Sequence, residues 1–177
     1  LVRTVLLKGS NSTKALFCLH YGLIHRWSQR ITYFMNEHSF VRSIHNALSP
    51  DVYKWKIHDT YTGGVPDAMY AGPAGVLFVE YKYVKSLPKK DTTAIRHSLS
   101  ALQCAWLERM KGSTNVALIL GVGTTALIIV DDFSANICKS TYVEQSIPRR
   151  QVAQWIYDVT HSGRANEKNK RTAPSRE

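Results

Sequence analysis

Charged residues interrupt two neighbouring apolar segments of this chain, at Asp67 and at Glu80 and Lys82. Asp67 follows Gly-Val-Pro, and the other residues of segment 76–84 are apolar or tyrosine. Burying an acid or a base costs free energy unless a partner stabilises it, and two adjacent carboxylates both stay ionised only beside a cation. Mg²⁺ or Mn²⁺ suits this role, because it binds carboxylate oxygens and keeps several waters. A metal held there could activate a water for attack on a phosphodiester bond.

Lys82 has two interpretations. Beside a metal, its ammonium group would position the attacking water or stabilise the transition state, and a deprotonated Lys82 would act as a base. Without a metal, Lys82 would form a buried ion pair with one of the two acids. We favour the metal site, because one lysine leaves the second carboxylate uncompensated.

The turn between the two segments predicts how they pair. Residues 72–75 read Gly-Pro-Ala-Gly, which suits a type I turn. A hairpin that folds about the central Pro-Ala places Asp67 directly opposite Glu80. Facing residues of such a pair have Cβ atoms about 4.5 to 5.5 Å apart, so both carboxylates could contact one cation. Lys82 is two residues beyond Glu80 and therefore shares its face of the strand.

Two predicted helices bring further polar groups to this hairpin. Apolar residues at spacings of three and four indicate a helix over 36–48, with Glu37 on the apolar face. A second helix is predicted over 94–110, with Gln103 beside an apolar stripe that includes Leu102. We expect both helices to pack on the sheet that contains the hairpin.

The remaining elements define the fold class. Short apolar or alternating runs predict strands, and Ser146 and Pro148 introduce a last helix over 148–159. The predicted strands are 52–58, 66–71, 76–84, 115–121 and 125–130. The order α-β-β-β-α-β-β-α predicts an α/β fold with a central mixed β-sheet flanked by helices.

The motif Val-Pro-Asp67, a hairpin, Glu80-Tyr-Lys82 and a helix with Gln103 resembles the PD-(D/E)xK nuclease superfamily. Within it, the chain is most similar to VRR-NUC and phage-type Holliday-junction-resolvase-like nucleases. Residues 102–107, Leu-Gln-Cys-Ala-Trp-Leu, resemble the Gln-x-x-Trp-Leu helix of that group. The resemblance covers about 36–130 and implies a restriction-endonuclease-like core and a Mg²⁺- or Mn²⁺-dependent endonuclease that cleaves branched DNA. A homodimer would allow nicks on opposite strands.

The same resemblance assigns roles to individual residues. Asp67, Glu80 and the backbone carbonyl of Tyr81 would bind the metal, and Lys82 would be the catalytic lysine. Glu37 would complete the acidic cluster, as a metal ligand and catalytic group, and Gln103 would support substrate or water. Alternatives stay open: Glu37 could serve only the helix dipole, and Gln103 could be a polar flank. The chain as a whole could be a non-catalytic nucleic-acid-binding protein that keeps the fold, or a restriction-like or exonucleolytic enzyme.

The net charge of +10 over 177 residues lies mostly in the two ends of the chain. Residues 1–34 contribute +5 and residues 161–177 contribute +3, so the charge alone is weak support for a nucleic-acid partner. A basic linker over 85–93 follows the hairpin and is longer than in compact relatives. Its cations and the next one along are expected to contact DNA phosphates: Lys85, Lys89, Lys90 and Arg96.

The ends of the chain lead to separate expectations. Residues 1–34 form a basic, acid-free extension, either an organellar transit peptide or a sequence upstream of a natural start at Met35. One nuclease domain is predicted over 35–160, followed by a basic disordered tail over 161–177. No apolar run approaches the roughly 18 residues that span a bilayer. The three cysteines form no CxxC pair, which favours a reducing compartment such as the cytoplasm, including a host cytoplasm for a viral protein.

Overall fold

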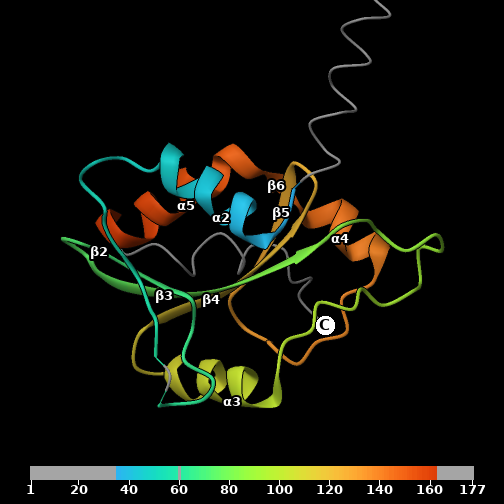
Figure 1. The fold of residues 1–177 in the computed structure, drawn as a ribbon, viewed down its shortest axis with the longest axis horizontal. Coiled ribbons are helices and arrows are strands. Elements are labelled where there is room, and N and C mark those ends of the chain that lie inside the picture. Colours follow the sequence, from blue (N-terminus) through green and yellow to red (C-terminus); the bar gives the residue numbers. More distant parts are fainter. Residues whose placement is uncertain (1–34, 60, 163–177) are drawn as a thin grey trace, which may run out of the picture. The chain divides into compact units, whose positions relative to one another are not determined.

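The computed structural model describes residues 35–59 and 61–162. The predicted tail over 161–177 was placed two residues too early, because residues 161 and 162 belong to the last helix. Residues 1–34 and 163–177 lie outside the described residues, and the expectations about them stay predictions. The described elements form a mixed β-sheet of six strands with helices on both faces (Figure 1). This confirms the predicted α/β class with a central mixed sheet. In the described part, no helix has the length and apolar character needed to cross a membrane.

The sheet contains one parallel pair among antiparallel neighbours. The parallel pair is β3 with β4, and it requires a crossover, which runs through helix α3 (Ala101–Met110). The strands lie in chain order across the sheet: β1 (Tyr53–Lys56), β2 (Ala68–Gly72), β3 (Gly75–Val84), β4 (Asn115–Val122), β5 (Thr125–Ile129) and β6 (Ile147–Pro148). Strand β1 is therefore an edge strand, and β3 lies inside the sheet.

The hairpin of β2 and β3 has the predicted register. Gly72 pairs with Gly75 at the turn, and Ala68 pairs with Val79 at the far end. Asp67 directly precedes β2, and continuing the same register places it opposite Glu80. The register could be predicted because it follows from a local turn, in which the last Gly has φ = +134°, a conformation that glycine adopts without strain.

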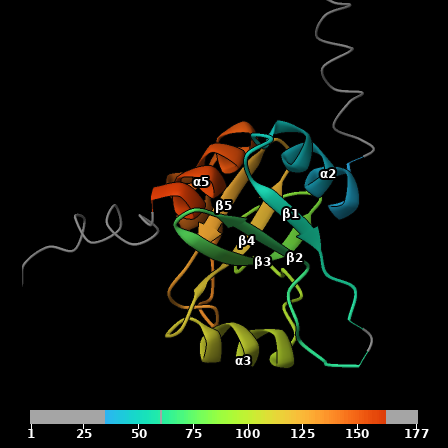
Figure 2. The same cartoon turned by 90° about the vertical axis from the view of Figure 1, so that its left-hand side faces the viewer.

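Helices α2 (Glu37–Ala47) and α5 (Arg149–Ser162) cover one face of the sheet, and α3 covers the other (Figures 1 and 2). The first helix was predicted almost to the residue, because Asn36 and Ser39 form a reciprocal capping box. Phe40 and Ile44 are its fully buried residues. The Phe40 ring lies over Gly121, where an added Cβ would be 2.5 Å from Phe40 Cζ.

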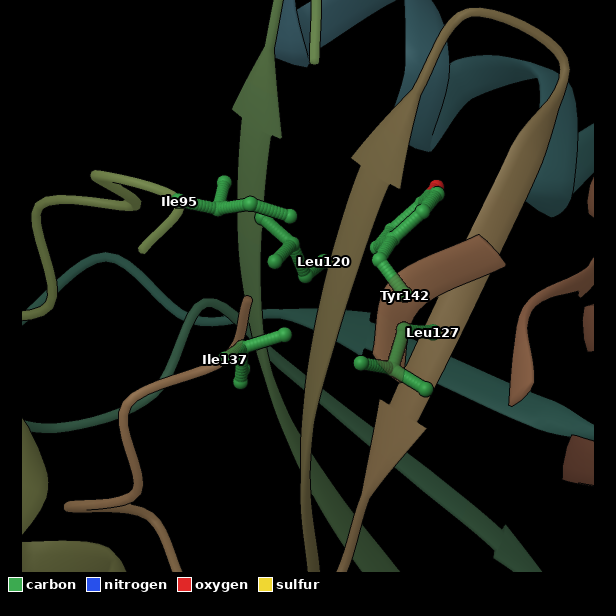
Figure 3. Close-up of a cluster of buried hydrophobic side chains, with 5 residues drawn as sticks. All are labelled: Ile95, Leu120, Leu127, Ile137 and Tyr142. Atoms are coloured by element: carbon green, nitrogen blue, oxygen red, sulfur yellow. The ribbon is translucent and has the colours of Figure 1, made fainter. Parts of the chain in front are cut away.

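The second helix was predicted too long. It begins at Ala101 rather than at residue 94, because Ser100 caps it and Ser98 has φ = +56°, outside the helical region. Residues 95–100 form neither helix nor strand, and the Ile95 N–H donates to the Ile137 carbonyl oxygen at 2.8 Å. Ile95 packs in a buried cluster with Leu120, Leu127, Ile137 and Tyr142 (Figure 3). Leu102, predicted on the apolar stripe, is 64% exposed.

Two short elements were absent from the predicted order. Helix α4 (Lys139–Gln145) buries Tyr142, whose hydroxyl group bonds to the Thr125 hydroxyl group at 3.0 Å. Strand β6 then pairs with β5 before α5 begins. Both depend on contacts with distant parts of the chain rather than on a local apolar period.

We predict that Gly121→Ala lowers the free energy of unfolding by about 1 to 3 kcal/mol, because the methyl group overlaps the Phe40 ring. Urea unfolding followed by circular dichroism measures the effect. Gly112→Ala is the matched control, since an added Cβ there meets nothing within 4 Å. Equal stability of the two variants would contradict the packing described here.

Candidate active site

Alternate residues of β3 face the two sides of the sheet. Phe78, Glu80 and Lys82 face α3, where Phe78 contacts Trp106 with ring centroids 5.4 Å apart. Leu77, Val79 and Tyr81 are buried on the opposite side, beneath α2 and α5. Both faces of the strand are thus packed against helices, and the charged residues lie only on the α3 face, next to the apolar contact of Phe78.

Glu80 is fully buried, with 0% of its surface exposed. Its Oε1 accepts hydrogen bonds from Lys82 Nζ and from Gln103 Nε2, each at 2.6 Å. Its Oε2 has no hydrogen-bond partner among the residues that the structure describes. Burial, followed by the nearby charge of Asp67, raises the pKa of Glu80 to about 7, although Lys82 acts in the opposite direction. The carboxylate therefore has one free buried oxygen that a cation would stabilise.

Gln103 is oriented by the start of helix α3. Its Oε1 accepts from the Ser100 N–H at 3.0 Å, within the capping box, and its Nε2 is left to donate to Glu80. The loop before Asp67 packs against the same turn. Gly64 has φ = +87°, and a Cβ there would lie 2.4 Å from the Leu102 carbonyl oxygen. Glycine at this position therefore allows the loop and the helix to meet.

Asp67 is held by backbone groups on both sides. Its Oδ2 accepts from the Tyr81 N–H at 2.8 Å, and its carbonyl oxygen accepts from the Ile57 N–H at 2.9 Å. The Tyr81 side chain points to the other face, where its hydroxyl group bonds to that of Tyr70 at 2.7 Å. Tyr70 in turn bonds to His45 Nε2 at 2.7 Å. This chain of hydrogen bonds fixes the strand segment that positions Asp67 and Glu80.

Glu37, the first residue of α2, reaches the same place from another element. The pKa of its carboxyl group is raised, mainly by partial burial and also by the charge of Asp67. The charge of Lys82 and a hydrogen bond with the Tyr83 backbone act in the opposite direction. The fold thus gathers five of the predicted side chains, which we call the carboxylate site: Glu37, Asp67, Glu80, Lys82 and Gln103. Their chemical roles stay predictions.

The cations predicted to contact DNA lie in the segment between β3 and α3. Lys85, Lys89, Lys90 and Arg96 are all exposed. The segment is fixed to α4, because Lys139 Nζ donates to the Lys89 carbonyl oxygen at 3.2 Å and pairs with Asp91 at 2.8 Å. Contact of these four cations with nucleic acid stays a prediction.

His97 was not predicted as part of the site. Burial and the charge of Lys82 lower the pKa of His97, so its half-buried ring lies near the carboxylate site. It was missed because the segment was predicted as helix, whereas Ser98 turns the chain there. Arg42 of α2 and Lys54 and Lys56 of β1 were also not predicted, although they line a hollow with Glu37 and Asp67. The alternation over 53–56 places the two lysines on one face of a strand, but no sequence signal points to Arg42.

The donors of the carboxylate site fit a hard divalent cation. In the described part of the chain, no group of three His, Cys, Asp or Glu residues is arranged to hold a metal alone. Mg²⁺ usually binds proteins through one or two carboxylates and keeps waters, so it needs no such group. The unpartnered Oε2 of Glu80 and the Asp67 carboxylate supply oxygen ligands of this kind.

Comparisons with known proteins show a distant structural likeness only. A scan against protein-family models finds no match, and a search of curated proteins finds no significant match. Among solved structures, the chain is similar to Hjc, a Holliday junction resolvase from the archaeal hyperthermophile Archaeoglobus fulgidus. The TM-score is 0.42 at 16% sequence identity, and the match covers 66% of this chain and 99% of that chain. A function has to be inferred from the site itself.

We predict that the metal-free protein loses stability as the pH rises from 4.5 to about 7. The pKa of Glu80 is raised from 4.5 to about 7 in the folded protein, which therefore holds this proton more tightly than the unfolded chain. This contribution is complete below pH 4.5 and is lost as the pH rises through 7. It is at most about 3 to 4 kcal/mol, since one pKa unit corresponds to about 1.4 kcal/mol. Urea unfolding in EDTA across this range measures it.

Glu80→Gln is the control for this pH dependence. The amide cannot ionise, so the same series should show a smaller fall in the free energy of unfolding. A fall of the same size in this variant would assign the dependence to another group.

Proposed function

We propose that this protein is a Mg²⁺- or Mn²⁺-dependent nuclease that hydrolyses phosphodiester bonds of DNA. The observation that carries the proposal is the fully buried Glu80, whose Oε2 has no partner among the described residues and which lies beside Asp67. A buried ion pair alone would leave this oxygen uncompensated. A divalent cation bound to it and to Asp67 would stabilise both carboxylates and explain why acids occupy an apolar sheet.

Each residue of the carboxylate site has a separate role in the proposed reaction. A bound metal would lower the pKa of a coordinated water and neutralise charge on the phosphate. Glu80 and Asp67 would hold the metal, and Gln103 leaves Glu80 Oε2 free by donating to Oε1. Lys82 Nζ lies 2.6 Å from Glu80 Oε1. It places a positive charge where the transition state gains negative charge. Glu37 adds a third carboxylate at the edge of the site.

The substrate is proposed to be branched or otherwise structured DNA, cut endonucleolytically, with a homodimer as the acting form. The support is the resemblance of the Val-Pro-Asp67 and Glu80-Tyr-Lys82 motifs to junction-cleaving nucleases. A substrate panel and the oligomeric state in solution test these finer points. Cleavage only at DNA ends would replace the endonuclease by an exonuclease.

We predict that the protein cleaves labelled four-way junction, flap or linear DNA in Mn²⁺ and not in EDTA. Asp67→Asn, Glu80→Gln and Lys82→Ala should each lower the cleavage rate by about a hundredfold or more, because each removes a charge used in the transition state. Glu108→Gln and Lys111→Ala are matched controls, taken from the partly exposed ion pair between Glu108 of α3 and the C-cap residue Lys111. Denaturing gel electrophoresis measures the rates.

Two results would contradict the mechanism: cleavage in EDTA, or full activity of the three site variants. Metal binding has an independent readout. Mn²⁺ should raise the melting temperature of the wild type more than that of Glu80→Gln, since it binds the folded state. DNA binding without cleavage of any substrate would favour the non-catalytic alternative.

A further inference from the structure

A hollow lies between α2 and β1, on the face of the sheet opposite to α3. Its volume is about 560 Å³, and its lining includes Glu37 and Asp67 of the carboxylate site. The other charged residues of the lining are Arg42 of α2 and Lys54 and Lys56 of β1. We call this hollow the α2–β1 groove. It leads directly to two of the acids that the proposed function uses.

Strand geometry aims the two lysines into the groove. Lys54 pairs with Tyr70, and Lys56 pairs with Ala68, and both partners are buried on the α2 side of the sheet. Cross-strand partners share a face, so the lysines point to that side as well. Lys54 Nζ donates to the His45 carbonyl oxygen at 3.2 Å, near the end of α2. The cations therefore line the groove instead of spreading over the edge of the sheet.

The described lining of the groove holds three permanent cations against two acids. Among the described residues, none of Arg42, Lys54 and Lys56 forms an ion pair with a carboxylate. Apart from Glu37 and Asp67, the described lining carries no acid. Burial and then Lys54 and Lys56 lower the pKa of His45, which is consistent with a positive field in this hollow. Such a surface complements a polyanion.

We propose that the α2–β1 groove binds the sugar-phosphate backbone of the DNA substrate and leads it to Glu37 and Asp67. Arg42, Lys54 and Lys56 contact phosphates beside the bond that is cut, without reading bases. This inference rests on the proposed nuclease function and adds the surface by which the substrate enters. It also differs from the contact predicted for the linker after β3, whose cations belong to another part of the fold.

The test compares two sets of substitutions that remove equal charge. The groove variant is Arg42→Gln with Lys54→Gln and Lys56→Gln, and the linker variant is Lys85→Gln with Lys89→Gln and Lys90→Gln. Fluorescence anisotropy with a fluorescein-labelled four-way DNA junction in EDTA measures affinity from low to moderate salt. Circular dichroism and thermal melting establish that each variant is folded.

We predict that the groove variant binds the junction about tenfold or more weakly than the wild type. Its plot of log affinity against log salt should be shallower, with the magnitude of the negative slope smaller by about 2, because up to three phosphate contacts are lost. The linker variant should lose much less of both. Wild-type affinity and slope in the groove variant would overturn the proposal, and so would equal losses in the two variants, which would indicate a diffuse basic surface.

Failure of this inference is distinguishable from failure of the proposed function. Glu80→Gln should bind the junction as the wild type does, yet fail to cut it in Mn²⁺. If the wild type binds and cuts while the groove variant does both equally well, only the groove is refuted. If the wild type neither binds nor cuts any DNA, the nuclease proposal falls and the groove proposal with it. Lys56→Gln alone, which keeps the Lys54 bond to α2, should show a smaller loss of the same kind.

Discussion

The buried carboxyl group of Glu80 needs hydrogen-bond donors, and the surrounding structure supplies them. Buried carboxylates are costly unless donors reach them, and here one donor comes from β3 and another from α3. The α3 donor is available only because the parallel crossover carries the chain over the face of β3. The close approach of Gly64 to Leu102 then fixes the loop that ends at Asp67. Sheet topology, helix start and loop conformation therefore converge on one side chain.

The division of β3 into two faces separates stability from chemistry. On one side, Tyr81, Tyr70 and His45 form a hydrogen-bonded chain beneath α2, and Phe40 packs at 6.4 Å from the Tyr81 ring. On the other side, Glu80 and Lys82 remain close to the open end of the hairpin. Because the polypeptide between them is shared, rigid packing on the first side limits movement of the second. A site built on a central strand is more precise than one built on a loop.

Local rules sufficed for the hairpin and the first helix but not for the elements that depend on distant contacts. The register of Asp67 and Glu80 follows from a turn of four residues, and the position of Glu37 follows from helical spacing and a cap. The start of α3 does not, because Ile95 has helical spacing to Leu99 yet bonds to Ile137. The cations of the α2–β1 groove also escaped prediction. Strand alternation groups Lys54 with Lys56, but only tertiary packing shows that α2 closes over them.

The amide of Gln103 joins two equilibria that are usually independent. One end of it completes the cap of α3, and the other end holds Glu80. Fraying of the first helical turn must then break the hydrogen bond from Gln103 to Glu80 Oε1. Protonation of Glu80 must in turn weaken this hydrogen bond. Thermodynamic linkage makes this reciprocal: whatever stabilises the ionised carboxylate also stiffens the beginning of the helix. A cation bound at the carboxylate site would therefore stabilise the first turn of α3, the helix whose Trp106 packs on Phe78 of the strand that carries Glu80.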